Sequence, residues 1–141
     1  MTLSTLTSHR IEIATRLFEA WSSGDPDAPA QWFAPDGVLF DVASGRFEGW
    51  PAIRAFFARG LKRVGNLTLV PDEFWENESG LALHYVMSGD VVDATGFDDA
   101  LLGRRWSVEV MSLLRFDGDR VNYEADFHDK GARLKSLGVG V

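Results

Sequence analysis

The segment from Arg120 to Asp129 concentrates ionisable side chains near the end of the chain. It reads RVNYEADFHD, and alternation along a strand would place Glu124, Asp126 and His128 on one face. A carboxylate that aromatic side chains shield from water has a raised pKa and can exchange a proton near neutral pH. The segment therefore predicts acid–base chemistry centred on Asp126 and His128. For Glu124, a plain solvent-exposed position is an equally good interpretation.

The composition leaves His, Asp and Glu as the groups that could carry out chemistry. The chain contains no Cys, which excludes disulfides, thiolate nucleophiles and Cys-ligated metal sites. Its 14 Lys and Arg residues against 21 Asp and Glu give a net charge of −7, which would repel a phosphate backbone. We therefore expect no nucleic-acid partner.

The length of 141 residues suits a single domain spanning residues 1–141. No apolar run reaches the roughly 18 residues that a membrane span needs, so we expect no membrane partner. The first residues, MTLSTLTSHR, lack the basic start and the apolar stretch of a signal peptide, which favours a cytoplasmic location.

The elements that must position these groups begin with helices. Apolar residues recur every three or four positions from Ile11 to Trp21, which indicates one helical face. Asp27 can cap a short second helix, and Pro35-Asp36-Gly37 has the composition of a turn that follows it. We expect helices over residues 11–21, 27–33 and 50–64, and short strands over 38–42 and 45–49.

The second half of the chain changes to long segments rich in β-branched and aromatic residues, separated by turn signals. We expect four antiparallel strands over residues 66–77, 80–93, 104–117 and 120–127, followed by a short helix over 130–137. Helices followed by strands indicate an α+β fold, in which a curved antiparallel sheet wraps around the three N-terminal helices.

Alternation along the two central long strands assigns their side chains to two faces. His84 and Val86 would share the concave face with Trp106, Val110 and Ser112. The convex face also carries apolar side chains, and a two-fold homodimer would bury them. The expected interface residues are Leu83, Tyr85, Met111 and Leu113. Scattered exposure of these side chains on a monomer is the alternative.

The order of several short motifs resembles a known superfamily. The chain has GDPDAPAQWFAPDGVLFD, then GRFEGWPAIRAFF, then a strand ending in ADFHD that is followed by KGARLKSLG. From Ile11 to Gly138, this pattern is similar to the nuclear transport factor 2-like superfamily, in particular its SnoaL-like polyketide cyclase branch. The resemblance implies a cone-shaped α+β barrel with a deep pocket, no metal, no organic cofactor, and frequent dimers through the convex sheet face.

Ketosteroid isomerases of this superfamily use an Asp after the first strand as the base, and Asp41 matches that position. Their two oxyanion donors, a phenol and a protonated carboxyl group, would fall at Leu17 and Ser112 here. Each such donor is worth roughly 3 kcal/mol of transition-state stabilisation. The resemblance therefore does not extend to a steroid isomerase of the standard kind.

SnoaL-like cyclases use a final-strand carboxylate as the acid–base group, and Asp126 matches it, with His84 as a candidate partner. Limonene epoxide hydrolases also carry an Asp at this place, but their Arg-x-Asp partner would align with Val86-Met87-Ser88. Because both partner charges are missing, epoxide hydrolysis is disfavoured. A metal site built from Glu124, Asp126 and His128 together with His84 is a weaker interpretation.

These observations predict a cofactor-independent acid–base enzyme of the cyclase, isomerase or dehydratase type, acting on a small apolar carbonyl or polycyclic molecule. The expected catalytic residues are Asp126, Asp41, His84 and His128. The expected substrate-binding residues are Ser112, Glu124, Leu17, Trp21, Phe57, Val86, Trp106 and Val110. The alternative is a non-catalytic dimeric domain that binds a ligand or another protein.

Overall fold

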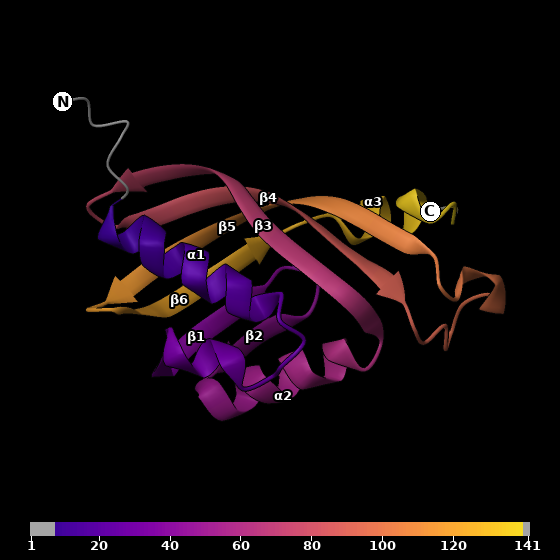
Figure 1. The fold of residues 1–141 in the computed structure, drawn as a ribbon, viewed down its shortest axis with the longest axis horizontal. Coiled ribbons are helices and arrows are strands. Elements are labelled where there is room, and N and C mark those ends of the chain that lie inside the picture. Colours follow the sequence, from indigo (N-terminus) through magenta and orange to yellow (C-terminus); the bar gives the residue numbers. More distant parts are fainter. Residues whose placement is uncertain (1–7, 140–141) are drawn as a thin grey trace.

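Helix α1 (His9–Trp21) begins where the Ser8 side chain accepts a hydrogen bond from the backbone N–H of Ile11, which is a typical N-cap. The computed structural model describes residues 8–139, and α1 lies across one face of a curved sheet (Figure 1). Its apolar face is fully buried against that sheet, including Leu17 and Phe18. The apolar residues that recur with helical periodicity therefore form the face of α1 that packs in the core.

The other helices are shorter. Helix α2 (Trp50–Leu61) has Pro51 in its first turn, where the missing N–H of proline costs nothing. A single 3-10 turn, η2 (Ala28–Gln31), replaces the expected second helix, and the Asp27 side chain binds Arg54 rather than capping it. A second turn, η3 (Asp99–Leu101), and helix α3 (Lys130–Ser136) follow later in the chain.

Six strands form one sheet in the order β2-β1-β6-β5-β4-β3. The strands are β1 (Phe33–Asp41), β2 (Gly45–Glu48), β3 (Val64–Asn77), β4 (Gly80–Val91), β5 (Arg105–Asp117) and β6 (Arg120–Phe127). The sheet is mixed rather than wholly antiparallel, because β1 and β6 pair in parallel. No hairpin joins these two strands, so local turn signals carry no information about their relative direction. The expected curved α+β sheet with helices against one face is confirmed.

The Pro35-Asp36-Gly37 segment lies inside β1 and not in a turn that precedes it. The register between β1 and β6 shifts between Phe33 and Val38, so the segment forms an irregularity in the strand. Gly37 allows this geometry because a Cβ atom there would lie 2.5 Å from the Phe33 ring. The segment predicted to be a turn therefore forms a bulge within β1, because turns and bulges favour the same residue types.

Strand β4 faces the opposite way from the prediction. Leu83 and Tyr85 point into the core, with 0% and 1% of their surface exposed, whereas His84 and Val86 point outward. Both faces of this strand carry apolar residues, and the more apolar set occupies the core. Leu83 and Tyr85 therefore cannot contribute to a convex interface. Strand β5 has the predicted orientation, with Trp106, Val110 and Ser112 buried and Met111 outward.

No helix within residues 8–139 combines the length and the hydrophobicity that crossing a bilayer requires.

Candidate active site

A cavity of about 540 Å³ lies between the concave face of the sheet, α2 and α3. This volume falls within the roughly 300–1,000 Å³ that is typical of small-molecule sites. Most of the wall is apolar and aromatic, and it includes Trp21, Leu39, Phe56, Phe57, Leu69 and Trp106. The cavity can therefore hold a small apolar molecule.

Three polar residues form a row across neighbouring strands, and two of them, Asp41 and Asp126, line the cavity. Asp41 of β1 pairs in register with Asp126 of β6, which in turn pairs with Ser112 of β5. Residues in register on neighbouring strands lie about 4.8 Å apart and point to the same face. The parallel pairing of β1 with β6 is what brings the two carboxylates together.

Asp126 ends a short chain of hydrogen bonds. The Ser112 hydroxyl donates to Asp126 Oδ1 over 2.6 Å, and the Tyr85 hydroxyl lies 3.1 Å from Ser112 Oγ. Because the Ser112 proton points to Asp126, Tyr85 acts as the donor to Ser112. Burial raises the pKa of Tyr85 well above its usual value, which keeps the phenol protonated. The chain stabilises a negative charge on Asp126.

Glu124 and Asp126 form a buried pair of carboxyl groups. Glu124 is 2% exposed and accepts a hydrogen bond from Trp21 Nε1 over 3.1 Å. Burial, followed by the charge of Asp126, raises the pKa of Glu124 well above its ordinary value, so Glu124 keeps its proton and hydrogen-bonds to Asp126. Burial also raises the pKa of Asp126, although the hydrogen bonds from Glu124 and Ser112 oppose the rise. Asp126 is therefore a stronger base than an exposed aspartate.

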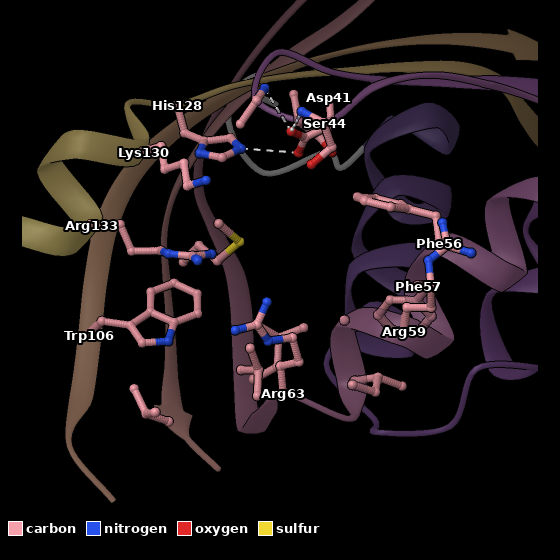
Figure 2. Close-up of a pocket in the computed structure, with 18 of the residues that line it drawn as sticks. Asp41, Ser44, Phe56, Phe57, Arg59, Arg63, Trp106, His128, Lys130 and Arg133 are labelled. Atoms are coloured by element: carbon pink, nitrogen blue, oxygen red, sulfur yellow. Dashed lines mark hydrogen bonds and ion pairs between the residues drawn. The ribbon is translucent and has the colours of Figure 1, made fainter. Parts of the chain in front are cut away.

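Asp41 and His128 form a second pair beside the first (Figure 2). His128 Nε2 donates to Asp41 Oδ2 over 3.0 Å, and the backbone N–H groups of Ala43 and Ser44 donate to Oδ1. Burial acts to raise the pKa of Asp41, but the hydrogen bond from His128 and the two backbone bonds hold it below its ordinary value. Asp41 is thus a fixed negative charge, which itself raises the pKa of Asp126.

The other ring nitrogen of His128, Nδ1, is buried and has no hydrogen-bond partner among residues 8–139. Within the same residues, no group of three or more His, Asp or Glu side chains is arranged to hold a metal ion. The four residues Asp41, Glu124, Asp126 and His128 are therefore best described as two acid–base pairs.

The structure separates His84 from the other predicted catalytic residues. Its ring lies on the convex face, where Nδ1 is 2.7 Å from Asp72 and Nε2 is 3.3 Å from Glu109. Val86 lies on the same outer face with 44% of its surface exposed. The expectation that these residues meet Asp126 was wrong, because it followed from the reversed orientation of β4.

The remaining predicted binding residues fall into three places. Trp21, Phe57, Trp106 and Glu124 line the cavity together with the catalytic candidates. Leu17 and Val110 are buried at 0% and 1% exposure but lie in the core, outside the cavity wall. Ser112 lies behind Asp126, which it hydrogen-bonds.

Two features of the site were not predicted from the sequence. One is Tyr85, which supports Ser112 from the core side of β4. A comparison of the two faces of β4 could have indicated that Tyr85 points into the core, because Leu81, Leu83 and Met87 make the face that carries Tyr85 the more apolar one. The other is a group of cationic residues in the cavity wall: Arg59, Arg63, Lys130 and Arg133.

A family model described as a SnoaL-like domain matches residues 14–124. None of the curated proteins matches the chain. Similar solved structures include a hypothetical protein with a ketosteroid isomerase-like fold from Catenulispora acidiphila, in complex with trimethylamine. It is 23% identical, with a TM-score of 0.79, and the match covers 91% of this chain and 93% of that one.

Two further solved structures show the same fold. A proposed polyketide cyclase from Xanthomonas campestris is 18% identical, with a TM-score of 0.81 and coverage of 92% of this chain and 99% of that one. A proposed SnoaL-like polyketide cyclase from Shewanella putrefaciens is 15% identical, with a TM-score of 0.82 and coverage of 94% and 98%. At these identities the likeness establishes the shared fold.

Proposed function

Because this chain belongs to the SnoaL-like domain family, we propose that it is a cofactor-independent acid–base enzyme of the cyclase, isomerase or dehydratase type. Its substrate is a small apolar carbonyl compound. One observation carries the proposal: Asp126, a carboxylate with a raised pKa, lines an apolar cavity of about 540 Å³. A base of this kind removes a proton from carbon next to a carbonyl group at neutral pH.

In the proposed reaction, Asp126 takes the proton, and the electron pair of the broken C–H bond forms an enolate. Glu124 and Ser112 hydrogen-bond to Asp126 and hold it in position. Asp126 then returns the proton to another carbon in an isomerase, to the new alkoxide after aldol ring closure in a cyclase, or to the departing hydroxyl in a dehydratase. All three reaction types share the first step.

Asp41 and His128 act as positioning residues in this scheme. His128 and two backbone N–H groups keep Asp41 ionised and fixed. The negative charge of Asp41 makes Asp126 easier to protonate, which increases its strength as a base. In this scheme Asp126 is the base, while Asp41 and His128 contribute charge and position.

The Asp126→Asn variant tests the proposal. We expect wild-type protein in D₂O to exchange the α-hydrogens of at least one member of a panel of cyclic and aromatic ketones, measured by proton NMR. Asn retains the shape and the hydrogen bond to Ser112 but cannot accept the proton, so the exchange rate should fall by about 10²–10⁴-fold. Wild-type exchange rates in Asp126→Asn would exclude Asp126 as the base.

Two further variants provide controls in the same assay. Glu109→Gln removes a carboxylate from the outer face of β5, 82% exposed, and should leave the exchange rate unchanged. Asp41→Asn removes the charge beside Asp126 and lowers the pKa of Asp126. The acidic limb of the rate–pH profile should then move to lower pH while the plateau rate decreases, which a purely structural defect would not produce.

The alternative function is a non-catalytic domain that binds an apolar ligand in the same cavity. It requires the apolar wall but not the two carboxyl pairs, so ligand binding without α-hydrogen exchange by the wild type would favour it. The single-domain organisation and the cytoplasmic location stay predictions from the sequence.

A further inference from the structure

Four cationic side chains line the same cavity as the carboxyl pairs. Lys130 lies beside His128, whereas Arg133 and Arg63 lie farther from Asp41 (Figure 2). Arg59 lies in the last turn of α2 and Arg63 just after it, while Lys130 and Arg133 belong to α3. In Figure 2, Arg63 and Arg133 point toward the same space from these two elements. This concentration is unexpected in a chain with a net charge of −7.

These cations form no ion pairs with carboxylates among residues 8–139, since none of the four has a carboxylate oxygen within 4.0 Å. Asp93 also lines the cavity and feels the charge of Arg63, but its Oδ1 atom accepts hydrogen bonds from the backbone and side chain of Thr95. Arg63 itself donates to the Thr95 carbonyl over 3.0 Å. Positive charge therefore exceeds negative charge around Arg63 and Arg133.

Contact with Trp106 positions the Arg133 side chain. Its guanidinium stacks over the Trp106 ring at 4.7 Å, and Trp106 is only 3% exposed. Burial, followed by the nearby charge of Arg63, lowers the pKa of Arg133, while the negative charge of Asp41 acts in the opposite direction. Two guanidinium groups that repel each other beside an apolar wall are stabilised when an anion binds between them.

The anion must belong to an apolar molecule, because the space between the cations continues into the apolar cavity. The charges along the cavity favour one orientation of such a ligand. Away from Arg63 and Arg133, the wall carries the ionised Asp41 and the Glu124–Asp126 pair, which would repel an anionic group. The charge difference along the cavity thus directs the anionic group to the cations and the apolar body toward Asp126.

We propose that the ligand of this cavity is an amphiphilic carboxylate, whose acid group lies between Arg63 and Arg133 while its apolar body extends to Asp126. The inference rests on the proposed function only for the chemistry at Asp126. Recognition of the carboxylate depends on the two arginines and not on Asp126, since each guanidinium offers a planar pair of N–H donors that matches a carboxylate. Among apolar carbonyl compounds, we therefore expect a keto acid to bind more tightly than the neutral ketone of the same shape.

Isothermal titration calorimetry with two probes tests this inference. The probes are 1-naphthylacetate and the neutral 1-naphthylacetamide, which have nearly the same shape. We expect wild type at pH 7 and 50 mM NaCl to bind the acid about tenfold or more tightly than the amide. In the Arg63→Gln, Arg133→Gln double variant, the acid should lose this preference while the affinity for the amide stays within about twofold.

Lys135→Gln is the matched control, because it removes one charge from α3 at a residue outside the cavity wall and should keep the preference. If the double variant does not fold, salt provides a second measurement: 500 mM NaCl should weaken binding of the acid to wild type but not of the amide. Equal affinities for the two probes, no binding of the acid at 5 mM, or a preference retained by the double variant would overturn the inference.

The two proposals fail separately. Asp126→Asn should keep the preference for the acid, because it leaves both arginines in place. A retained preference together with wild-type exchange rates in Asp126→Asn would refute the acid–base function but leave the ligand class intact. A missing preference together with the expected loss of exchange would refute the ligand class but leave the acid–base function intact.

Discussion

Glu124 shows how one residue can serve function at the expense of stability. Its carboxyl group is 2% exposed and lies beside Asp126, so the folded protein holds a proton there that the unfolded chain releases at lower pH. A group whose folded pKa is raised in this way lowers the stability of the fold as the pH rises above the unfolded value. The same burial gives Asp126 the basicity that the proposed reaction needs.

The Glu124→Gln variant should reveal this cost. Gln retains the shape and can still accept the hydrogen bond from Trp21 Nε1, but it has no proton to lose. We expect the variant to gain stability relative to wild type as the pH rises from 5 to 9, measured by urea unfolding. Glu76→Gln, an exposed change on β3, should show no such trend. A constant difference between Glu124→Gln and wild type across this range would contradict the prediction.

At the level of elements, β1 is the strand that completes the site. It joins the sheet in parallel beside β6 and so places Asp41 next to Asp126. The irregularity at Gly37 shifts the register between Phe33 and Val38, which sets the alignment of the last part of the strand. A residue with a side chain at position 37 would disturb both the core and this alignment.

Gly37→Ala should therefore destabilise the protein. The added Cβ would lie 2.5 Å from the ring of Phe33, which is 1% exposed and has no room to move. Overpacking of this kind costs about 1–3 kcal/mol, measurable by chemical denaturation. Gly60→Ala in α2 is the matched control, because a Cβ there meets open space and alanine favours the helix by up to about 1 kcal/mol. Equal stabilities of the two variants would show that β1 adapts without strain.

For the whole molecule, the convex face of the sheet carries exposed apolar side chains that have no role in the cavity. Its exposed apolar side chains belong to four neighbouring strands and include Val70, Val86, Met111 and Phe127. Val70 pairs with Val86 and Met111 pairs with Phe127, so these four residues form two cross-strand pairs. These two pairs lie beside the polar residues His84 and Glu109. Exposed apolar pairs of this kind favour the homodimer predicted from the sequence, with these residues in place of Leu83 and Tyr85.

Light scattering coupled to size-exclusion chromatography measures this directly. We expect twice the chain mass of 15.6 kDa for the wild type at about 100 μM, and a monomer for Met111→Lys. Leu102→Lys changes an exposed apolar residue in the loop after η3 and should remain dimeric. A monomeric wild type at this concentration would contradict the prediction.

Most of the fold could be predicted from the sequence, because helices and strands depend on local periodicity. The bounds of β4, β5 and β6 and the apolar face of α1 agree closely with the patterns that predicted them. The site was predicted in part. The alternation in RVNYEADFHD places Glu124, Asp126 and His128 in the cavity wall, and the motif resemblance placed Asp41 with them.

What the sequence alone determined is the set of elements and the chemistry available to them. It could not decide which face of β4 meets the core, because apolar residues occur on both faces and the choice depends on the energy of the whole packed sheet. Nor could it show that Arg63 and Arg133, which follow different elements, face one cavity. Only the tertiary structure decides such matters, because they depend on contacts between segments that no local pattern links.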